Sequence, residues 1–332
     1  MSTTIQTVQS SVNLQSIRFL PYPSPDRDPR SAMLGSKAES SRRKYRESLV
    51  VILGLFVQLP TVNPGDDVLD LVPLRWESIS PAHVGMVRQA LSGQFARSTV
   101  NRHLSALRSL MKSCWNMGLI DHETYQRFVD ETKAKRVNRP KFDTGRLVTD
   151  EEFQMMLGTC DGSPLGFRDA AILSIMFFAG LRRSEVVDLD LDQYDRTGRV
   201  LVSVKGKGDK VREVPIPVNA RLAVRLNSWL AVRGSEPGPL FQAVRRGGHV
   251  QPGRMSSQAI YNVVKGRADQ AGLDADSIVA HDFRRTFTTN ALDASEGNTV
   301  LVSDLVGHSN PATTARYNRA GLAAYRDLID RM

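Results

Sequence analysis

The stretch LGFRDAAILSIMFFAGLRRSE, residues 165–185, joins a strongly apolar segment to two adjacent arginines. The apolar run predicts a buried helix over 165–181 that ends near Gly180, because glycine commonly ends a helix in the left-handed conformation. Arg182 and Arg183 follow at once, and a cation at a helix C-terminus is favoured by the macrodipole whether or not it serves a site. We expect only one arginine of such a pair to point into a site from a helix end.

Downstream of this helix, residues 199–216 are predicted to form a β-hairpin. Valines alternate over 200–204, apolar residues alternate again over 214–216, and the segment GKGDK at 206–210 supplies the turn. Strand alternation places Lys205 and Lys207 on the same face, so spacing alone does not choose between them. The turn lacks the spacing of a nucleotide-binding loop, which excludes a P-loop.

The rest of the C-terminal half has helical periodicity. Thr149 and Glu152 fit a capping box, and helices are predicted over 219–233, 256–271 and 281–292, with short helices at the end of the chain. Together with the hairpin, this pattern predicts a unit that is mainly α with a small antiparallel β-sheet, the α+β class.

The N-terminal half is predicted to be helical after a flexible tail over residues 1–35, which is rich in Ser, Thr, Gln and Pro. The alternative for this tail is an arm that orders on DNA or on a neighbouring protomer. Ser36 and Glu39 fit a capping box for a helix that runs to Leu59. Further helices are predicted after Ser80, over 98–118 with an apolar stripe from Val100 to Cys114, and over 122–133.

A basic segment separates the two patterns. Five of the nine residues over 133–141 are Lys or Arg and one is Pro, which is typical of an interdomain linker. The predicted domain plan is a tail over 1–35, a helical domain over 36–132, a linker over 133–144 and a second domain over 145–332.

Composition excludes several classes of protein. The 332 residues favour about two domains, and 44 Lys and Arg against 35 Asp and Glu give a net charge of +9. This excess indicates an anionic partner, nucleic acid first and an anionic membrane surface second. No apolar run approaches the roughly 18 to 20 residues that span a bilayer, and no secretory signal is visible. Cys114 and Cys160 predict buried thiols rather than a disulfide framework, and the histidines do not cluster as zinc ligands.

Four segments carry polar residues that together indicate a catalytic site, although each segment by itself is weak evidence for one. They contribute the adjacent pair Arg182 and Arg183, the hairpin lysines Lys205, Lys207 and Lys210, the i,i+3 pair His281 and Arg284, and His308 with Tyr317 nine residues later. Guanidinium groups with few carboxylates suit a phosphodiester, because they stabilise a pentavalent transition state without a metal ion. A tyrosine hydroxyl can be the nucleophile, although its ordinary pKa of about 10 requires neighbouring cations and a base.

The order of these residues resembles the tyrosine recombinases, also called the phage integrase family, and within it Xer-type and mobile-element integrases. The matching segments are AGLRRSE at 179–185, GKGDK at 206–210, HDFRRTF at 281–287 and LVGHSNPATTARY at 305–317. The resemblance is strong over about 145–320, which implies the family's mixed α/β catalytic domain. It is weaker over 36–132, which resembles the helical, SAM-like core-binding domain that contacts DNA.

The resemblance implies a role for each matching residue. Arg182 and Arg284 would hold the scissile phosphate, and Tyr317 would form a 3′-phosphotyrosyl bond. Lys207 would be the general acid for the leaving 5′ oxygen, His281 a proton acceptor or phosphate ligand, and His308 a donor to a phosphate oxygen. Glu185 would support the first arginine. The motif favours Arg182 over Arg183, where family members more often carry an apolar residue, and Tyr317 over the alternative nucleophile Tyr325.

The resemblance also implies how the protein works on DNA. The expected partners are double-stranded recombination sites, bound by a homotetramer on two duplexes that exchanges strands in pairs through a Holliday junction. No cofactor, metal or ATP is expected, no membrane is involved, accessory proteins are undetermined, and the expected location is the bacterial cytoplasm at the nucleoid. The alternatives are a type IB topoisomerase-like enzyme that relaxes DNA and a non-catalytic DNA-binding relative.

Basic side chains outside the motif are expected to contact the flanking DNA backbone. They are Arg102, Arg108 and Lys112 on the 98–118 helix, and Lys133, Lys135, Arg136, Arg139 and Lys141 in the linker. The alternative for both groups is a solvated polar surface. The segment 320–332 is expected to form a last helix that docks on a neighbouring protomer or packs against its own.

Overall fold

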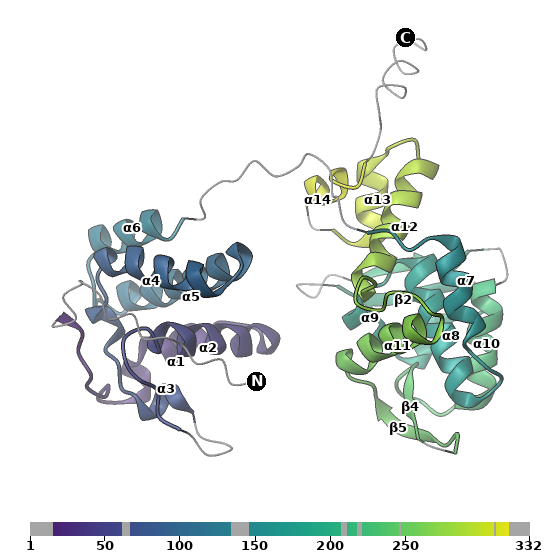
Figure 1. The fold of residues 1–332 in the computed structure, drawn as a ribbon, viewed down its shortest axis with the longest axis horizontal. Helices are drawn as coiled ribbons and strands as arrows, with labels where there is room; N and C mark the ends of the chain where they lie inside the picture. The colour runs from purple at the N-terminus through teal and green to yellow at the C-terminus, as the bar shows by residue number, and fades with distance from the viewer. Residues whose placement is uncertain are drawn as a thin grey trace, which may run out of the picture. The chain divides into compact units, whose positions relative to one another are not determined.

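The computed structural model describes residues 16–61, 67–133, 146–206, 211–217, 221–245, 247–308 and 310–318 (Figure 1). The chain divides into two compact units, Met1–Val137 and Asn138–Met332. The division falls inside the segment expected to be a linker, of which residues 134–145 lie outside the described residues.

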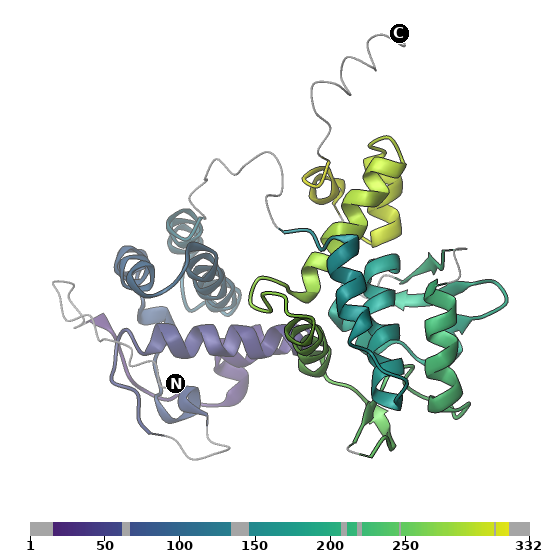
Figure 2. The same ribbon diagram turned by 45° about the vertical axis from the view of Figure 1, so that its right-hand side comes forward.

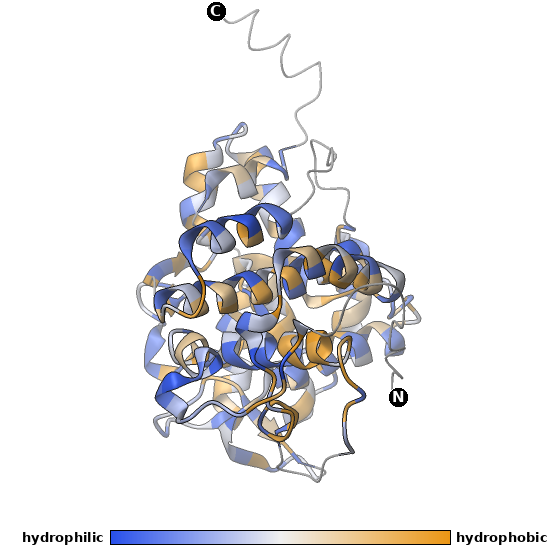
Figure 3. Cartoon of the chain, turned by 90° about the vertical axis from the view of Figure 1, so that its left-hand side faces the viewer, coloured by the Kyte–Doolittle hydropathy of each residue, from blue (hydrophilic) through white to orange (hydrophobic). Residues whose placement is uncertain are grey.

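The first unit is all helical in the part that the structure describes. Its elements are η2 (Pro25–Arg27), α1 (Pro29–Gly35), α2 (Glu39–Leu53), α3 (Val68–Leu71), η3 (Trp76–Ser78), α4 (Pro81–Gln94), α5 (Arg97–Asn116) and α6 (His122–Glu131). The predicted stripe on α5 is buried from Val100 to Cys114, which confirms the helical periodicity. Hydrophobic and hydrophilic residues lie side by side along these helices, as expected for a small bundle (Figure 3).

Three predictions at the N-terminus are wrong. Residues 16–35 belong to the fold and not to a tail: Met33 is 1% exposed in the core of the unit, and Ile17 and Tyr22 pack against that core. The capping box at Ser36 is not formed, because the Ser36 hydroxyl donates to Met33 O at 2.7 Å at the end of α1. The next helix starts at Glu39 and ends at Leu53, short of the expected Leu59.

The second unit is mainly α with small antiparallel sheets, which confirms the predicted class, although it has two such sheets where the sequence predicts one. Its helices are α7 (Asp150–Gly158), α8 (Pro164–Ala179), α9 (Arg183–Asp188), η4 (Leu191–Gln193), α10 (Arg221–Arg233), α11 (Ser257–Gln270), α12 (Ala280–Ala294), α13 (Thr299–Val306) and α14 (Pro311–Ala315). One sheet has the order β1 (Tyr194–Asp195), β2 (Val200–Lys205), β3 (Val211–Pro215), and the other pairs β4 (Gln242–Val244) with β5 (Val250–Arg254). None of the described helices has the length and apolar composition to cross a membrane.

Helix α8 is the centre of this unit. Ile172 and Met176 are fully buried, and α10, α11 and α12 pack around the helix (Figures 1 and 2). The helix ends at Gly180, which has φ +61°, as the sequence predicts. A Cβ atom there would lie 2.3 Å from a ring atom of Phe287 on α12. Glycine is therefore required both by the backbone conformation and by the close approach of α12.

The β2–β3 hairpin is present, but its alternation is interrupted. The register shifts between Leu201 and Val204, where Ser203 adopts φ +53°. This irregularity places Leu201 and Val204 in the core and leaves Val200 and Val202 half-buried, so the predicted alternating face over 200–204 is wrong. Residues 207–210 of the turn lie outside the described residues.

Candidate functional site

The turn after α8 places Arg182 at the N-cap of α9. Its backbone N–H donates to Glu185 Oε2 at 2.8 Å, and its Nη1 donates to Glu185 Oε1 at 2.6 Å. Its Nη2 donates to the carbonyl of Gly307, 125 residues away in the chain, at 3.0 Å. Arg182 thereby joins the start of α9 to the end of α13.

The carboxylate of Glu185, which is 2% exposed, gathers three guanidinium groups. Besides Arg182, Arg212 Nη1 and Nη2 donate to Oε1 and Oε2 at 3.0 and 2.9 Å, and Arg284 Nη1 lies 3.8 Å from Oε2. Burial alone would raise the pKa of Glu185. Hydrogen bonds from Arg212 and from the Arg182 backbone, with the charges of Arg212 and Arg284, outweigh that effect and hold the pKa below its ordinary value.

Arg212 is a site residue that the sequence analysis missed. It lies on β3 on the same strand face as the buried Val214, and an arginine on the core side of a strand is a signal that the sequence contained. Its Nε donates to the carbonyl of Leu305 at 3.1 Å, in addition to its two bonds to Glu185.

The C-terminal end of α13 receives all three arginines. Arg212 donates to Leu305 O, Arg284 donates to Val306 O, and Arg182 donates to Gly307 O. Arg284 Nη1 also donates to Gly180 O at 2.8 Å. Unpaired carbonyls at a helix end carry partial negative charge, so this end of α13 orients the guanidinium groups without adding an acid.

The cluster keeps an excess of positive charge. Glu185 is its one carboxylate among the described residues, against three guanidinium groups. Burial, together with the charge of Arg182, lowers the pKa of Arg284 to about 9, so this group is still a cation at neutral pH. A buried cluster with unbalanced positive charge is suited to bind an anion.

A cavity of about 420 Å³ opens beside the cluster. Its lining combines basic and polar side chains with two apolar ones: Arg182, Arg183, Ser184, Ser257, Tyr261, Val279, Ala280, His281 and Arg284. His281 and Arg284, one turn apart on α12, face this cavity together, as their spacing predicts. The expectation that only one of Arg182 and Arg183 points into the site is wrong. Arg182 is the extended N-cap and Arg183 the first helical residue of α9, and this change of backbone direction turns both toward the cavity.

His308 and Tyr317 lie together within electrostatic range of the arginine cluster. Their ring centroids lie 6.3 Å apart at an interplanar angle of 20°, and Tyr317 packs with Leu292, Val302 and Val306. The Thr314 hydroxyl lies 2.8 Å from His308 Nδ1. Burial and the charges of Arg284 and Arg182 lower the pKa of His308 to about 4, so the ring is neutral at pH 7. The threonine hydroxyl can donate or accept in this bond; if it donates to Nδ1, the proton of the neutral ring lies on Nε2, which can then donate.

The remaining predicted catalytic residue, Lys207, lies outside the described residues, and the described Lys205 is exposed at the end of β2. Among the described residues no group of three or more His, Cys, Asp or Glu side chains is arranged to hold a metal ion.

The basic residues expected to contact flanking DNA have different surroundings. Arg102 and Lys112 are exposed on α5, whereas Arg108 is half-buried and donates from Nε to Thr132 Oγ1 at 2.7 Å. Because Arg108 also donates to Thr132 O at the end of α6, its guanidinium is held within the fold, and its contact with DNA stays a prediction. Lys133 lies 2.6 Å from Asp130 in an exposed pair. Lys135, Arg136, Arg139 and Lys141 lie outside the described residues.

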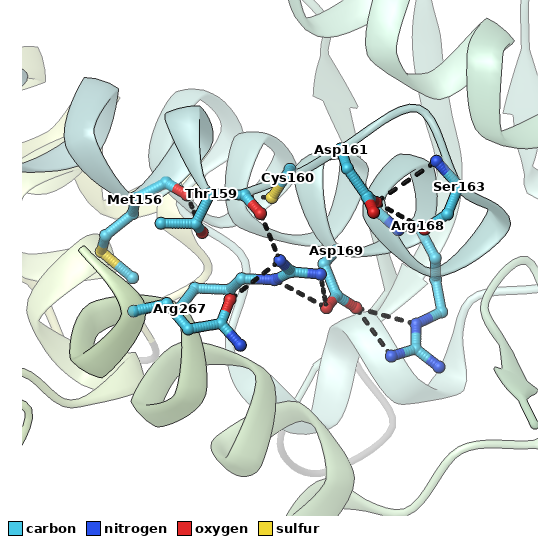
Figure 4. Close-up of polar contacts among 10 residues, drawn as sticks. Met156, Thr159, Cys160, Asp161, Ser163, Arg168, Asp169 and Arg267 are labelled. Carbon is cyan, nitrogen blue, oxygen red and sulfur yellow. Dashed lines mark hydrogen bonds and ion pairs between the residues drawn. The ribbon is translucent and has the colours of Figure 1, made fainter. Parts of the chain in front are cut away.

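A buried ion pair fixes α11 against α8. Arg267 on α11 donates from Nε and Nη2 to Asp169 Oδ2 at 2.9 and 2.8 Å, and from Nη1 to Thr159 O at 2.6 Å (Figure 4). Arg168 completes the network by donating to the second oxygen of Asp169. Since α11 also carries Ser257 and Tyr261, this network sets the position of one wall of the cavity.

Comparison with known proteins gives one consistent result. The model of the phage integrase family matches residues 146–322. Tyrosine recombinase XerC of Alcanivorax borkumensis is 33% identical over 236 residues, which cover 69% of this chain and 70% of the relative. Tyrosine recombinase XerC of Mycobacterium sp. (strain JLS) is 29% identical over 306 residues, 90% of this chain and 94% of the relative. The fold is similar to that of the Tn1549 transposon integrase in complex with transposon right end DNA, with TM-score 0.63, 16% identity and coverage of 92% and 98%.

Proposed function

The chain belongs to the phage integrase family and is a tyrosine recombinase, and we propose that it cleaves and rejoins double-stranded DNA at specific sites through a 3′-phosphotyrosyl intermediate on Tyr317. The observation that carries this proposal is the three-guanidinium cluster around Glu185, which lies beside both the cavity and the His308–Tyr317 pair. A phosphodiester is the anion that this charge and the tyrosine nucleophile suit together.

In the proposed step the Tyr317 oxygen attacks phosphorus and the bond from phosphorus to the 5′ oxygen breaks. Arg182 and Arg284 hold the non-bridging oxygens, and their carbonyl partners on α13 keep both groups oriented as negative charge develops. His308 donates from Nε2 as a neutral ring. Following the family resemblance, His281 takes the proton of the tyrosine and Lys207 gives one to the leaving 5′ oxygen.

Rejoining reverses these bonds, so the phosphodiester is restored without ATP. A 5′ hydroxyl from a second duplex attacks the phosphotyrosine, and the tyrosine leaves. Exchange between two duplexes requires four such cleavages, which supports the proposal of a homotetramer that cuts strands in pairs and passes through a Holliday junction. Arg102, Lys112 and the linker cations are proposed to contact the flanking backbone.

The decisive experiment traps the covalent intermediate. Duplex fragments with a nick near the cleavage point lose the short strand after cleavage, so the protein stays attached to the 3′ end. Sequencing DNA that remains bound to the protein after denaturation identifies the site. Wild type is expected to give an adduct and Tyr317→Phe none, with DNA binding retained. Tyr325→Phe is the matched control and is expected to react normally.

Three outcomes would contradict the proposal. An adduct formed by Tyr317→Phe would show that another residue is the nucleophile. Relaxation of a supercoiled plasmid without any product that joins two sites would indicate a type IB topoisomerase-like activity, and binding without any adduct would indicate a non-catalytic relative.

A further inference from the structure

We propose that Arg183, seated on the ring of Tyr261, binds a second backbone phosphate of the DNA, next to the phosphate that is cleaved. This inference rests on the proposed function and adds a contact to it. Arg183 was set aside in the sequence analysis because the motif favours Arg182, yet both side chains line the same cavity.

The contacts of Arg182 and Arg183 indicate different roles for the two arginines. Arg182 is bound to Glu185 and to Gly307 O within the cluster. The guanidinium carbon of Arg183 lies 5.9 Å from the ring centroid of Tyr261, which is within the range of a cation–π contact. Tyr261 and Ser257 are four residues apart on α11 and both line the cavity, so they present one helix face to it.

Within the described residues the donors of Arg183 are not used for hydrogen bonds or ion pairs, in contrast to those of Lys265, the other cation near the Tyr261 ring. Lys265 lies 5.6 Å from the Tyr261 centroid, but it donates to Ala275 O and pairs with Asp276 at 3.6 Å. In the part of the chain that the structure describes, Arg183 has the ring contact and no hydrogen bond or ion pair. Its donors are therefore available to a ligand in the cavity.

The lining identifies the chemical class of that ligand. It contains three arginines, a histidine, two serines and a tyrosine, and no acidic residue of the described chain lines it. The volume of about 420 Å³ is that of a site for a whole small molecule rather than for one anionic group. Because successive phosphates of one strand lie only about 3.4 Å apart along the duplex axis, an arginine adjacent in sequence to Arg182 is placed to reach a neighbouring phosphate.

Tyr261 gives this contact its direction. The guanidinium carbon lies over the face of this ring, and a guanidinium held against an aromatic face keeps its in-plane N–H donors available for bidentate phosphate binding. The Asp169–Arg267 pair holds α11 against α8, so the ring does not have to be ordered when DNA binds (Figure 4). A preformed contact of this kind improves binding because less conformational entropy is lost.

The test combines protein variants with DNA in which one phosphate at a time is replaced by a neutral methylphosphonate. Arg183→Leu is expected to weaken binding of the intact site about tenfold, the effect of losing one charge-assisted hydrogen-bonded contact. It should also reduce the slope of log affinity against log salt by about 1. Arg183→Lys should recover part of the affinity. Tyr261→Ala should resemble Arg183→Leu, whereas Tyr261→Phe keeps the ring and should bind as wild type does.

The position of the contact is read from the substituted substrates. One methylphosphonate next to the scissile phosphate should lower the DNA affinity of wild type about tenfold. It should leave the DNA affinity of Arg183→Leu unchanged, since the partner charge is already absent in that variant. Arg196→Leu removes an equal charge from an exposed position and should show no such dependence on a single phosphate. If every methylphosphonate weakens DNA binding by Arg183→Leu as much as it weakens DNA binding by wild type, the proposed contact does not exist.

Failure of this inference can be told from failure of the proposed function. Absence of a covalent adduct with wild type would refute the recombinase chemistry. An adduct with wild type, combined with unchanged binding and salt slope in Arg183→Leu, would refute only the second phosphate contact.

Discussion

Replacing Glu185 by Gln is expected to destabilise the second unit by about 3–5 kcal/mol, the typical cost of breaking a buried ion pair. The carboxylate accepts from Arg182 N, Arg182 Nη1 and both terminal nitrogens of Arg212, at distances of 2.6 to 3.0 Å. A glutamine keeps one acceptor oxygen and turns an NH2 group toward a guanidinium. The variant thus loses hydrogen bonds and leaves three cations, of which Arg284 is buried, without a counter-charge.

The assay is urea unfolding followed by tryptophan fluorescence. The sequence has three tryptophans. Only Trp229, which is fully buried, lies in the second unit, so replacing Trp76 and Trp115 by Phe isolates its signal. Glu213→Gln makes the same chemical change at an exposed position of β3 and should alter stability by less than about 0.5 kcal/mol.

The effect has a defined pH dependence. The pKa of Glu185 in the folded protein is held below the ordinary value of 4.5. The stabilisation that depends on its charge is therefore complete above that value and is lost as the pH falls through the folded pKa. The difference in the free energy of unfolding between wild type and Glu185→Gln should therefore become smaller in acid, below about pH 4.5.

A double-mutant cycle tests the charge argument directly. Arg212→Met should cost more stability in wild type than in the Glu185→Gln background, because in the variant it removes a repelling cation. The coupling should be about 1–3 kcal/mol. A loss below about 1 kcal/mol for Glu185→Gln, or additive single changes, would refute the view that Glu185 balances the cluster.

Three further changes test other parts of the site. Gly180→Ala puts a Cβ atom 2.3 Å from the Phe287 ring at a residue with φ +61°. A left-handed backbone alone costs about 1–2 kcal/mol, so with the clash the free energy of unfolding should fall by more than that. A smaller loss in urea unfolding would contradict the clash. The rate of single-turnover cleavage should show no inflection from His308 between pH 5 and 8, because the pKa of His308 is about 4. Thr314→Val should slow cleavage, because it removes the hydroxyl that holds His308 Nδ1. An unchanged cleavage rate in Thr314→Val would remove Thr314 from the mechanism. Asp169→Asn should cost about 3–5 kcal/mol while an exposed Asp192→Asn costs little, and equal losses would show that the network in Figure 4 is not stabilising.

Local signals predicted most of the secondary structure. The Thr149–Glu152 capping box forms as expected, with both reciprocal hydrogen bonds, and Gly180 ends α8 in the left-handed conformation. Such features depend on a few neighbouring residues, so periodicity and capping rules detect them. The same rules failed at residues 16–35, where Met33 is held by the core of the unit, and at Ser203, where a bulge changes which residues of β2 are buried.

By itself, the sequence determined the family, the helical and antiparallel elements, and the set of Arg, His and Tyr side chains proposed to carry the chemistry, because these follow from residue order and short spacings. Tertiary structure alone decided which groups meet. Arg182 reaches Gly307 across 125 residues, Arg212 reaches Glu185 of α9 from strand β3, and Arg183 shares the cavity with Arg182. Spacing along the chain reports local geometry only, whereas these contacts depend on how α9, β3 and α13 pack around α8 and α12.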